Sequence, residues 1–406
     1  MKFGLENIAA LCEALGHPER AFQSIVVAGT NGKGSVTVMA ETALRRAGLR
    51  AARYTSPHLV RLEERFVIDG REIDTAALTE SVGAVQNAVE SLLRRGALQG
   101  PPTFFECATA AAFELFRRAR VEIAVLEVGL GGRLDATNIV APVLTAITSI
   151  DFDHQAQLGD TLESIAREKA GIIKPGVPVV CGPLPGPAKT VVQDAAVAQR
   201  ARLIEANEAV RIEPRSSGSV DVLTGQRTLR DVTLALAGRH QRDNAAVAVA
   251  LLDELTGQGR RLSDDAVRAG LSEAIWPGRL ERLHRDGLDI LIDAAHNPAG
   301  ARALASHLQE IGWRRVTLVF GAMRDKDVPA MLETLAPCCG AIVCTTAPSP
   351  RALSADELAA MARPLIAAVE AVPDPEAALA AAGRSGRPIV IAGSIFLIGP
   401  LRDILR

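Results

Sequence analysis

The sequence has few aromatic residues and almost no net charge. Aromatic side chains make up 3% of its 406 residues, the formal net charge is -2, and no block of basic residues is present. Nucleic-acid binding needs a cationic surface and aromatic faces on which bases stack. The composition therefore argues against a nucleic-acid partner.

Long hydrophobic runs are also missing. No apolar stretch reaches the roughly 20 residues that a helix needs to cross a membrane. The N-terminal residues include charged side chains, among them Lys2, Glu6 and Glu13, so we expect no signal peptide. These features predict no membrane partner and a cytoplasmic protein.

The six cysteines form no C-x-x-C pair. Four of them lie among apolar or small residues, which is typical of buried free thiols. Cys338, Cys339 and Cys344 lie close together in the sequence, as in some metal or redox sites, but no histidine is near them. The pattern favours free thiols in a reducing compartment.

Strand and helix patterns alternate along the chain, which predicts parallel sheets covered by helices on both faces. At this length we expect two or three domains, and the Trp276–Arg279 stretch (WPGR) is the best boundary. We predict an α/β protein: a P-loop-containing, doubly wound, mainly parallel sheet domain (residues 1–278), followed by a smaller Rossmann-like α/β domain (283–406). The helices expected in the first domain are 6–15, 36–46, 75–95, 103–118, 161–173, 188–201 and 241–255. Those expected in the second are 298–311, 327–335, 354–367, 375–382 and 395–405.

One stretch has the layout of a phosphate-binding loop. The β-branched run Ile25–Ala28 leads into Gly29–Ser35 (GTNGKGS), and a helical pattern follows. Backbone N–H groups of such a loop, the positive end of the helix and the charge of Lys33 all favour a bound phosphate. Gly34 separates the lysine from the serine, unlike the usual G-x-x-x-x-G-K-[ST] spacing. A bare glycine turn is usually only a turn, whereas the lysine favours nucleotide binding.

Polar residues follow several other predicted strands. Ser56, Glu127, Asp153 and His154 each stand at or after the carboxyl end of a strand, where open parallel sheets bind ligands. A carboxylate, a hydroxyl and an imidazole near a phosphate loop suit Mg²⁺. Taken singly, Glu127 could instead be an ion-paired strand end, His154 a surface-loop histidine and Lys169 a member of an i,i+4 salt bridge.

Further motifs occur in order along nearly the whole chain. They are Tyr54–Leu59 (YTSPHL), Glu64–Gly70 (ERFVIDG), Thr103–Glu106 (TFFE), Glu127–Asn138 (EVGLGGRLDATN), Glu168–Ile172 (EKAGI), Gly238–Asn244 (GRHQRDN), Pro277–Arg279 (PGR), Asp293–Pro298 (DAAHNP), Val319–Met323 (VFGAM), Asp325–Asp327 (DKD) and Ala392–Ser394 (AGS). With these motifs and the phosphate loop, the sequence resembles the folylpolyglutamate synthase/dihydrofolate synthase family of the Mur-ligase-like superfamily.

The resemblance implies roles for the matching positions. It places the ATP phosphates on Thr30, Asn31, Gly32, Lys33, Gly34 and Ser35, and the adenine and ribose on Asn244, Arg279 and Asp293. It implies two Mg²⁺ sites, the first on Ser56 and Glu127 and the second on His154. It also implies that Lys169 reacts with CO₂ to become a metal-binding carbamate. The segments that would bind the pteroate are Phe3, Gly4, Thr103, Phe104, Phe105, Glu106, Leu134, Asp135 and Ala136.

The implied reaction is ATP-dependent amide formation. A dihydropteroate carboxylate, or the γ-carboxylate of a reduced folate, would form an acyl phosphate that the amine of L-glutamate then attacks. Lys33, Lys169, His154 and His296 are the expected catalytic residues, and His296 or Asp293 would accept the proton of the amine. The family also implies a monomer.

Alternatives remain at this point. The chain could have only one of the two synthase activities, or be a Mur-type ligase acting on another carboxylate. A regulatory P-loop protein would want an N-K-x-D motif, which is missing. A non-catalytic folate-binding relative would not need Glu127, His154 and Lys169. Two departures from the family pattern are Ala294, where glycine is usual, and Lys2, where an acidic or polar residue is common.

Overall fold

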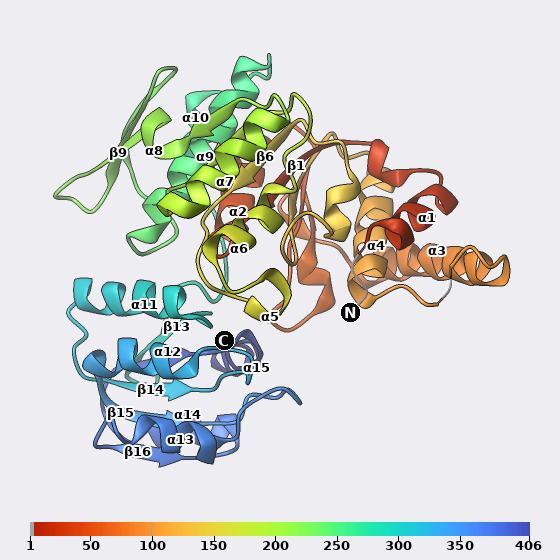
Figure 1. Ribbon diagram of the computed structural model, residues 1–406. Coiled ribbons are helices and arrows are strands. Elements are labelled where there is room, and N and C mark those ends of the chain that lie inside the picture. Colours follow the sequence, from red (N-terminus) through yellow and green to blue (C-terminus); the bar gives the residue numbers. More distant parts are fainter. Residues whose placement is uncertain (1–3, 99) are drawn as a thin grey trace. The chain divides into compact units, whose positions relative to one another are not determined.

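The computed structural model describes residues 4–98 and 100–406, which form two compact units (Figure 1). Unit 1 comprises residues 1–151, 158–235 and 242–275, and unit 2 comprises 152–157, 236–241 and 276–406. Phe3, a predicted pteroate contact, lies outside the described residues, as does Lys2. Two short segments, 152–157 and 236–241, thus belong by their contacts to unit 2 although their neighbours in sequence belong to unit 1.

Unit 1 is built on an eight-stranded sheet in the order β4-β3-β2-β5-β1-β6-β7-β8. The six strands from β2 to β8 in this order run parallel to one another. Strands β3 and β4 are antiparallel and lie at one edge of the sheet. The strands are β1 (Gln23–Ala28), β2 (Ala51–Tyr54), β3 (Phe66–Ile68), β4 (Arg71–Glu72), β5 (Ile123–Glu127), β6 (Leu144–Ile147), β7 (Val179–Cys181) and β8 (Leu203–Glu205). All five residues of β5 are buried, as expected for a parallel strand covered on both faces.

The helices of unit 1 cover both faces of that sheet. In Figure 1, α1, α3 and α4 lie on one side of β1, and α9 and α10 lie on the other. The helices of unit 1 are α1 (Glu6–Ala14), α2 (Lys33–Arg46), α3 (Thr75–Arg94), α4 (Phe104–Arg118), α6 (Leu162–Ala170), α7 (Gly186–Ala198), α8 (Ala206–Ala209), α9 (His240–Gly257, whose first two residues belong to unit 2) and α10 (Asp264–Ser272), whereas most of α5 (Gln155–Leu158) belongs to unit 2. The 3₁₀ turns are Pro18–Arg20, Leu62–Arg65 and Ala136–Ile139.

Helix α2 begins three residues earlier than the predicted start at residue 36. Gly32 is its N-cap and adopts a left-handed conformation with φ 86°. Lys33, Gly34 and Ser35 therefore lie in the first turn of the helix and not in the loop before it. The correction places the predicted phosphate ligands at the positive end of the α2 dipole.

The sequence pattern over residues 203–237 predicts short strands with turns, and unit 1 has a second sheet there, whereas helix α10 was not predicted. The antiparallel sheet has the order β11-β10-β9, with β9 (Val210–Pro214), β10 (Val220–Thr224) and β11 (Thr228–Val232). Helix α10 packs against α2, where a Cβ on Gly270 would come within 2.7 Å of the Cβ of Ala43. Its start carries ordinary signals, the N-cap Ser263 and two acidic residues in the first turn.

Unit 2 is a smaller α/β layer structure with the strand order β12-β13-β17-β14-β15-β16. Its strands are β12 (Glu281–Arg285), β13 (Leu288–Ile292), β14 (Val316–Phe320), β15 (Cys339–Cys344), β16 (Val369–Ala371) and β17 (Ile389–Ala392). All neighbours are parallel except β12, an edge strand that the sequence pattern did not predict. The predicted α/β class, with a doubly wound P-loop domain followed by a smaller Rossmann-like domain, is confirmed.

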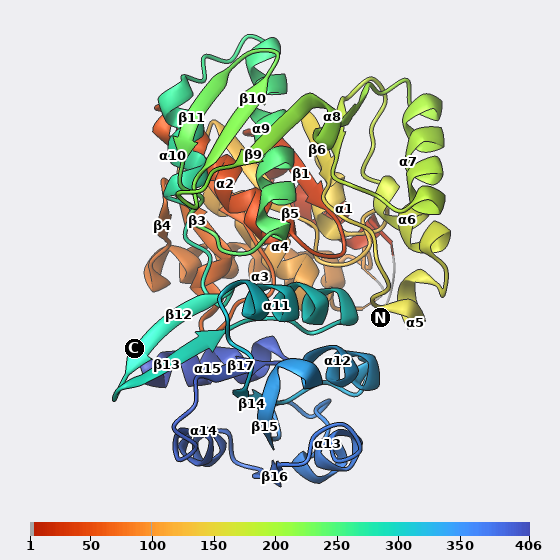
Figure 2. The same ribbon diagram turned by 90° about the vertical axis from the view of Figure 1, so that its left-hand side faces the viewer.

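The helices of unit 2 also lie on both faces of its sheet. Figure 2 shows α12 and α13 on one side of β14 and β15, and α14 and α15 on the other. The bounds are α11 (Pro298–Glu310), α12 (Val328–Leu335), the 3₁₀ turn Ala336–Cys338, α13 (Ala355–Ala362), α14 (Pro375–Gly383) and α15 (Ile395–Leu405). Helix α13 ends five residues before the predicted position, because Pro364 cannot continue the helix and disfavours helical backbone just before it.

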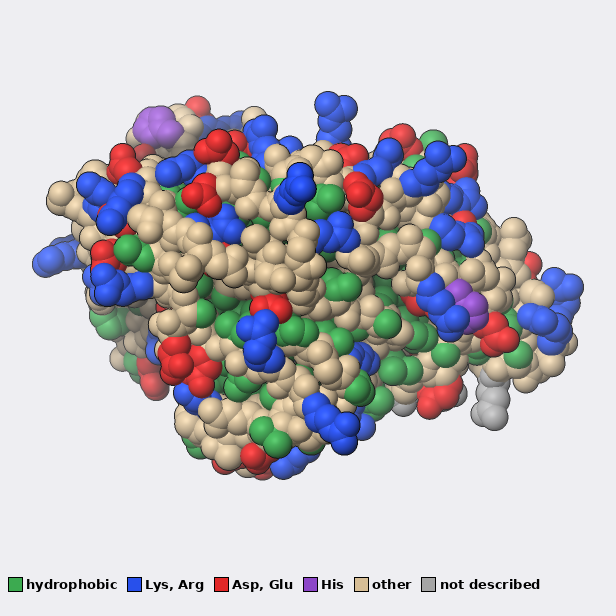
Figure 3. All heavy atoms as spheres, turned by 90° about the horizontal axis from the view of Figure 1, so that it is seen from above, with side chains coloured by type: hydrophobic (Ala, Val, Ile, Leu, Met, Phe, Trp, Pro, Cys, Tyr) green, Lys and Arg blue, Asp and Glu red, His purple; other side chains and the backbone are tan. Residues whose placement is uncertain are grey.

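Surface and thiol features agree with the composition. On the face shown in Figure 3, acidic and basic side chains are interspersed. None of the helices in the described parts of the chain is both long and apolar enough to span a membrane. All six cysteines are free, and Cys12, Cys181, Cys338 and Cys344 are buried. Within residues 4–98 and 100–406, no three His, Cys, Asp or Glu side chains gather as a metal-binding group.

Candidate active site

The phosphate loop connects β1 to α2 and has two glycines with positive φ. Gly29 has φ 149° and Gly32 has φ 86°. A Cβ on Gly32 would lie 2.2 Å from Oδ1 of Asn244, and one on Gly29 would lie 2.0 Å from Oγ1 of Thr148. Only glycine fits at these two positions. The predicted nucleotide ligand Asn244, which is buried on α9, therefore lies directly against the loop.

The end of β6 holds the loop in place. Thr148 Oγ1 donates to the carbonyl oxygen of Asn31 at 2.6 Å, and Ser149 Oγ accepts from the Asn31 N–H at 3.0 Å. Thr30 donates its N–H to the carbonyl of Ser149 at 2.8 Å and its hydroxyl to the carbonyl of Asp151 at 3.1 Å. Thr148 and Ser149 were not predicted as site residues. The signal that could have found them is their position just after β6, the strand next to β1.

Two lysines converge on one carbonyl oxygen of this loop. Lys33 Nζ lies 3.0 Å from the oxygen of Gly29 and 3.3 Å from that of Thr30. Lys169 Nζ, from α6, lies 2.9 Å from the same Gly29 oxygen and its residue is buried. The first i→i−4 hydrogen bond of α2 runs from Val36 N–H to the carbonyl of Gly32. Both ammonium groups and the N-terminus of α2 thus make this part of unit 1 electropositive.

Glu127 and Ser56 lie together at the carboxyl ends of the neighbouring strands β5 and β2. The Ser56 N–H donates to Oε2 of Glu127 at 3.2 Å, and the Glu127 residue is only 5% exposed. A buried carboxylate beside a hydroxyl-bearing residue is an oxygen donor set of the kind that Mg²⁺ or Mn²⁺ binds. The residues present fit the predicted first metal site, to which Lys169 would add oxygen donors only as a carbamate.

One predicted pteroate segment, Thr103–Glu106, contains an exposed aromatic ring. Thr103 and Glu106 form the capping box of α4: the Thr103 N–H donates to Oε2 of Glu106 at 2.6 Å, and the Glu106 N–H donates to Oγ1 of Thr103 at 3.2 Å. Phe104, between them, is 60% exposed, whereas Phe105 packs near Tyr54. Thr103 and Glu106 therefore fix the start of the helix that presents Phe104.

Asp135 organises the second of these segments. It is buried and accepts hydrogen bonds from the N–H of Leu130 at 2.9 Å and from the hydroxyl of Thr137 at 2.6 Å. Burial raises the pKa of Asp135, although these hydrogen bonds oppose the shift. Leu134 is partly exposed and Ala136 is buried beside it. Gly4, the described member of the N-terminal segment, is partly exposed as well.

Arg65 contacts the Phe104 ring, and His58 contacts Arg65. Neither residue was assigned a role from the sequence. The guanidinium carbon of Arg65 lies 5.2 Å from the centroid of the Phe104 ring, a cation–π distance. Arg65 Nε donates to Nδ1 of His58 at 3.0 Å, and Arg65 is only 7% exposed. Burial and the neighbouring Arg65 charge lower the pKa of His58, which suits its role as a neutral acceptor.

In unit 2, Asp293 ends β13 and is satisfied by backbone donors. Its carboxylate accepts from the N–H of Leu280 at 2.9 Å and from that of Ala295 at 2.8 Å. Burial raises the pKa of Asp293, and the nearby charge of Arg279 opposes that shift. Ala294 does not have a positive φ, so the replacement of the family's usual glycine causes no strain there.

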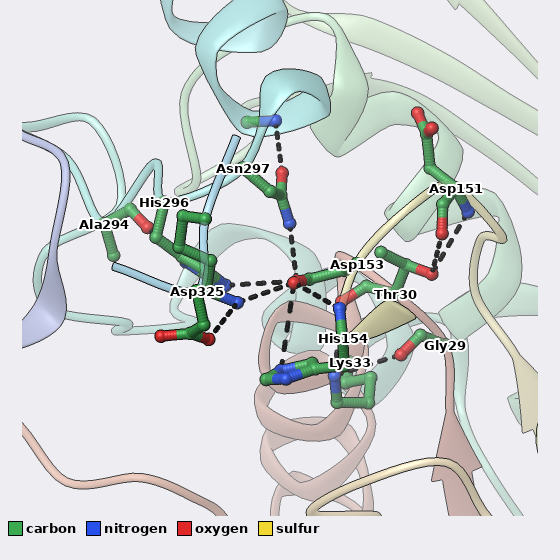
Figure 4. Close-up of polar contacts among 12 residues, drawn as sticks. Gly29, Thr30, Lys33, Asp151, Asp153, His154, Ala294, His296, Asn297 and Asp325 are labelled. Carbon is green, nitrogen blue, oxygen red and sulfur yellow. Dashed lines mark hydrogen bonds and ion pairs between the residues drawn. The ribbon is translucent and has the colours of Figure 1, made fainter. Parts of the chain in front are cut away.

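A second carboxylate of unit 2, Asp153, is the centre of a polar cluster (Figure 4). It contacts Lys326, Asn297 and His296 as well as the backbone of its own neighbour His154. Burial alone would raise the pKa of Asp153, but the hydrogen bond from His296 and the positive charges around it hold the pKa well below its usual range. The predicted catalytic residue His296 is oriented by a second contact, from Nδ1 to the carbonyl of Ala294 at 2.8 Å.

The structure thus divides the predicted site residues between the two units. Unit 1 contains the phosphate loop, Asn244, Ser56, Glu127, Lys169 and the described pteroate segments, and unit 2 contains His154, Arg279, Asp293 and His296. Within unit 1, the loop, Lys169 and Asn244 are brought together, and so are Ser56 and Glu127. Within unit 2, His154 and His296 meet at Asp153.

This combination of a glycine-rich loop domain and a second α/β domain defines a Mur-type ligase. The Mur ligase middle domain family matches residues 27–252, and the glutamate ligase domain family of the Mur ligases matches residues 278–395. Within this class, the chain belongs to the dihydrofolate synthase/folylpolyglutamate synthase family, an ATP-dependent ligase family. The family resemblance noted from the motifs is confirmed, as is the assignment of the chain to the ligases.

Relatives match the chain over its whole length. It is 35% identical over 414 residues to the dihydrofolate synthase/folylpolyglutamate synthase of Bacillus subtilis, covering 100% of this chain and 96% of the relative. It is 37% identical over 438 residues to the Mycobacterium tuberculosis protein of the same name, covering 98% and 89%.

Solved structures show the same fold. Mycobacterium tuberculosis folylpolyglutamate synthase complexed with ADP and AMPPCP has a TM-score of 0.93 at 34% identity, covering 99% of this chain and 95% of its own. Escherichia coli FolC in complex with DHPP and ADP has a TM-score of 0.89 at 30% identity, covering 100% and 93%. The Yersinia pestis bifunctional folylpolyglutamate synthase/dihydrofolate synthase, complexed with AMPPNP and Mn ion, has a TM-score of 0.88 at 33% identity, covering 100% and 94%.

Proposed function

We propose that this chain uses ATP to join L-glutamate to dihydropteroate and to the γ-carboxylate of reduced folates. The observation that carries the proposal is the convergence of Lys33 and Lys169 on the Gly29 carbonyl of the phosphate loop. The Lys33 ammonium group at a helix N-terminus serves an anionic nucleotide, Lys169 is the neighbouring amine that would become a carbamate, and a Glu127–Ser56 pair in the same unit suits the divalent metal. Relatives of matching length carry both synthase activities in their names.

The nucleotide-binding roles are proposed residue by residue. The backbone of Thr30 to Ser35 and the Lys33 ammonium bind the phosphates, and Asn244 lies against this loop. Arg279 and Asp293 take the ribose and adenine side. The ADP, AMPPCP and AMPPNP complexes of the relatives support this assignment.

Divalent metal is assigned to Ser56 and Glu127, with a second ion on His154. When bound, the metal would neutralise the negative charge that develops as the γ-phosphoryl group is transferred. The Yersinia pestis complex with Mn ion supports a metal requirement. Lys169 holds its amine against the loop and, once converted by CO₂ to a carbamate, adds oxygen donors. The conversion needs the neutral amine, and the Lys169 residue is buried.

Phe104 is proposed to stack on the pterin, with Asp135 fixing the loop beneath. The exposed ring and its support by Arg65 motivate this assignment. The Escherichia coli complex with DHPP and ADP supports a pterin ligand. Gly4, Phe105, Leu134 and Ala136 complete the proposed pocket, in which Thr103 and Glu106 act by capping α4.

For the proton of the glutamate amine, His296 is the better candidate of the two predicted. Both oxygens of Asp293 already accept backbone N–H groups, whereas His296 Nε2 lies 3.5 Å from Oδ2 of Asp153, a carboxylate that would stabilise the imidazolium formed when the ring accepts a proton. The chain's own steps are then clear. Lys33 stabilises the transferring phosphoryl group, and the His296 imidazole receives the amine proton.

The test is phosphate release from ATP in the presence of glutamate and one acceptor at a time. Dihydropteroate and tetrahydrofolate should each accelerate release and yield a product heavier by one glutamyl group. Acceleration with only one of them restricts the chain to a single activity. Acceleration with a UDP-muramoyl peptide instead would make it a Mur-type ligase, and none with any acceptor would leave a binding protein. Sedimentation of the same sample tests the expected monomer.

A further inference from the structure

We propose that Asp153 is a positioning residue that anchors segment 152–157 to the loops of unit 2 and sets the backbone of His154. The segment follows β6 in the chain, yet its contacts are with residues near 296 and 326. Nothing in the sequence gives Asp153 a role beyond its place after a strand. The inference rests on the proposed function only in its last step, where His154 is a metal ligand.

The carboxylate of Asp153 is almost completely satisfied within unit 2 (Figure 4). Its side chain is 7% exposed, and that of Lys326 is 8% exposed. Oδ1 lies 2.6 Å from Nζ of Lys326, and Oδ2 accepts from Nδ2 of Asn297 at 2.9 Å. His296 Nε2 lies 3.5 Å from Oδ2. Three side chains from two separate loops therefore hold one carboxylate in place.

The same carboxylate holds the next peptide group. The N–H of His154 donates to Oδ1 of Asp153 at 2.8 Å, and His154 has φ 51°. A left-handed conformation is unfavourable for a residue with a Cβ, so it persists where other contacts impose it. The Asp153 hydrogen bond is such a contact. The imidazole of His154 is 38% exposed, and its Nε2 lies 3.9 Å from Oδ1 of Asp153, so the same carboxylate faces both the backbone and the ring of His154.

The negative charge is essential to this arrangement. An asparagine at 153 would keep one acceptor but would remove the nearer anionic partner of the buried Lys326 ammonium group, 2.6 Å away, and leave only Asp325 at 3.9 Å. In Asp153→Asn, segment 152–157 should therefore detach from the two loops that contain His296 and Lys326. Asp153 thus acts on metal binding through His154 and does not itself contact the metal or substrate.

The experiment compares wild type, Asp153→Asn and His154→Ala by hydrogen exchange without nucleotide or metal. In Asp153→Asn, exchange of the amides of residues 153–157 should rise by about tenfold or more, as expected when a hydrogen bond to a charged group is lost. Helices α11 and α12 should keep their protection. His154→Ala should keep the anchor, because the backbone N–H at 154 remains.

The second readout is the affinity for Mn²⁺ measured by titration in the presence of AMPPNP. Asp153→Asn should weaken it by about tenfold or more, the range seen when partners that orient a ligand are removed. The matched control is Asp221→Asn in the β9–β11 sheet, another buried carboxylate that pairs with Arg215 and Arg230. It should change neither the exchange of residues 153–157 nor the Mn²⁺ affinity.

Asp153→Asn/Lys326→Met tests the charge argument. The double variant should regain part of the lost protection, because it no longer buries an ammonium group that has lost its nearer anionic partner. Unchanged exchange in Asp153→Asn would overturn the anchor. Faster exchange with unchanged Mn²⁺ affinity would overturn the positioning of a ligand. If wild type binds no Mn²⁺ with AMPPNP, the proposed function fails, while the exchange result still reports on the anchor alone.

Discussion

The Lys169 ammonium group donates a hydrogen bond of 2.9 Å to the carbonyl oxygen of Gly29, across 140 residues of sequence. The contact links helix α6 to the phosphate loop inside unit 1. It places a reactive amine beside the proposed phosphate site, and Lys33 reaches the same oxygen from α2 at 3.0 Å. A lysine held there by burial and by a carbonyl is available for the carbamate chemistry proposed above.

Lys169→Ala should lower the rate of phosphate release by about a hundredfold or more, the scale of losing one group that stabilises the transition state electrostatically. Added short-chain carboxylic acids should restore part of the rate, because they supply the oxygen donors of the missing carbamate. The measurement is the rate with and without such acids. Lys189→Ala is the control, since Lys189 pairs with Glu205 away from the loop. Full activity of Lys169→Ala would remove the carbamate from the mechanism.

Gly32→Ala and Gly48→Ala form a matched pair for the phosphate loop. Both glycines have φ 86°, so each alanine should cost roughly 1–3 kcal/mol of stability through backbone strain. Only at Gly32 would the new Cβ meet Asn244, at 2.2 Å, whereas nothing lies within 4 Å at Gly48. ATP affinity, measured by calorimetry, should therefore fall in Gly32→Ala alone. Equal affinity in both variants would show that the Asn244 contact does not shape the nucleotide site.

The phosphate loop and its layout could be predicted because they are local. Consecutive residues form β1, the glycine turn and α2, and Lys33 marks the turn as a nucleotide site. The start of α2 was predicted three residues too late, because the left-handed N-cap at Gly32 has no hydrophobic periodicity to reveal it. Glu127 could be found because a charge that ends a buried strand is costly without a partner.

The parts of the site that depend on distant pairing could not be predicted. Asp153 owes its role to Asn297 and Lys326, which follow it by 144 and 173 residues. The support of Phe104 by Arg65 depends on the packing of a loop against α4, and no spacing in the sequence encodes that contact. Strand β12 is short, charged and at a sheet edge, so its residues lack the apolar run of the interior strands.

Phe104→Ala should raise the KM for dihydropteroate by about three- to tenfold, because the loss of one aromatic stacking contact weakens binding by about that factor. Because Phe104 is 60% exposed, the free energy of unfolding should change by less than about 0.5 kcal/mol. Phe396→Ala is the control, since Phe396 is also partly exposed and also lies near an arginine, Arg351, at 5.9 Å. An unchanged KM in Phe104→Ala would place the pterin elsewhere.

Arg65→Lys should raise the same KM without removing the positive charge. Lysine has no planar guanidinium group with which to donate to His58 and at the same time contact the face of the Phe104 ring. The KM for ATP should stay unchanged, because the phosphate loop does not contact Arg65. Steady-state kinetics with each substrate varied in turn separates the two constants. A rise in the KM for ATP with that for dihydropteroate unchanged would contradict the supporting role.

The free energy of unfolding should fall in mild acid, because the folded protein resists protonation of the His240 imidazole. Burial first, and then the charge of Arg279, lower the pKa of His240 from 6.5 to about 4, so the folded protein favours the neutral imidazole. Above pH 6.5 neither the folded nor the unfolded state is protonated at His240, and its full contribution to stability is present. Between pH 6.5 and 4 the unfolded chain binds the proton first, and up to about 3 kcal/mol of the free energy of unfolding should be lost.

Urea unfolding across this pH range should show a steeper loss of stability in wild type than in His240→Gln. His284→Gln, which replaces an exposed histidine, should follow wild type, and parallel curves for wild type and His240→Gln would contradict the assignment.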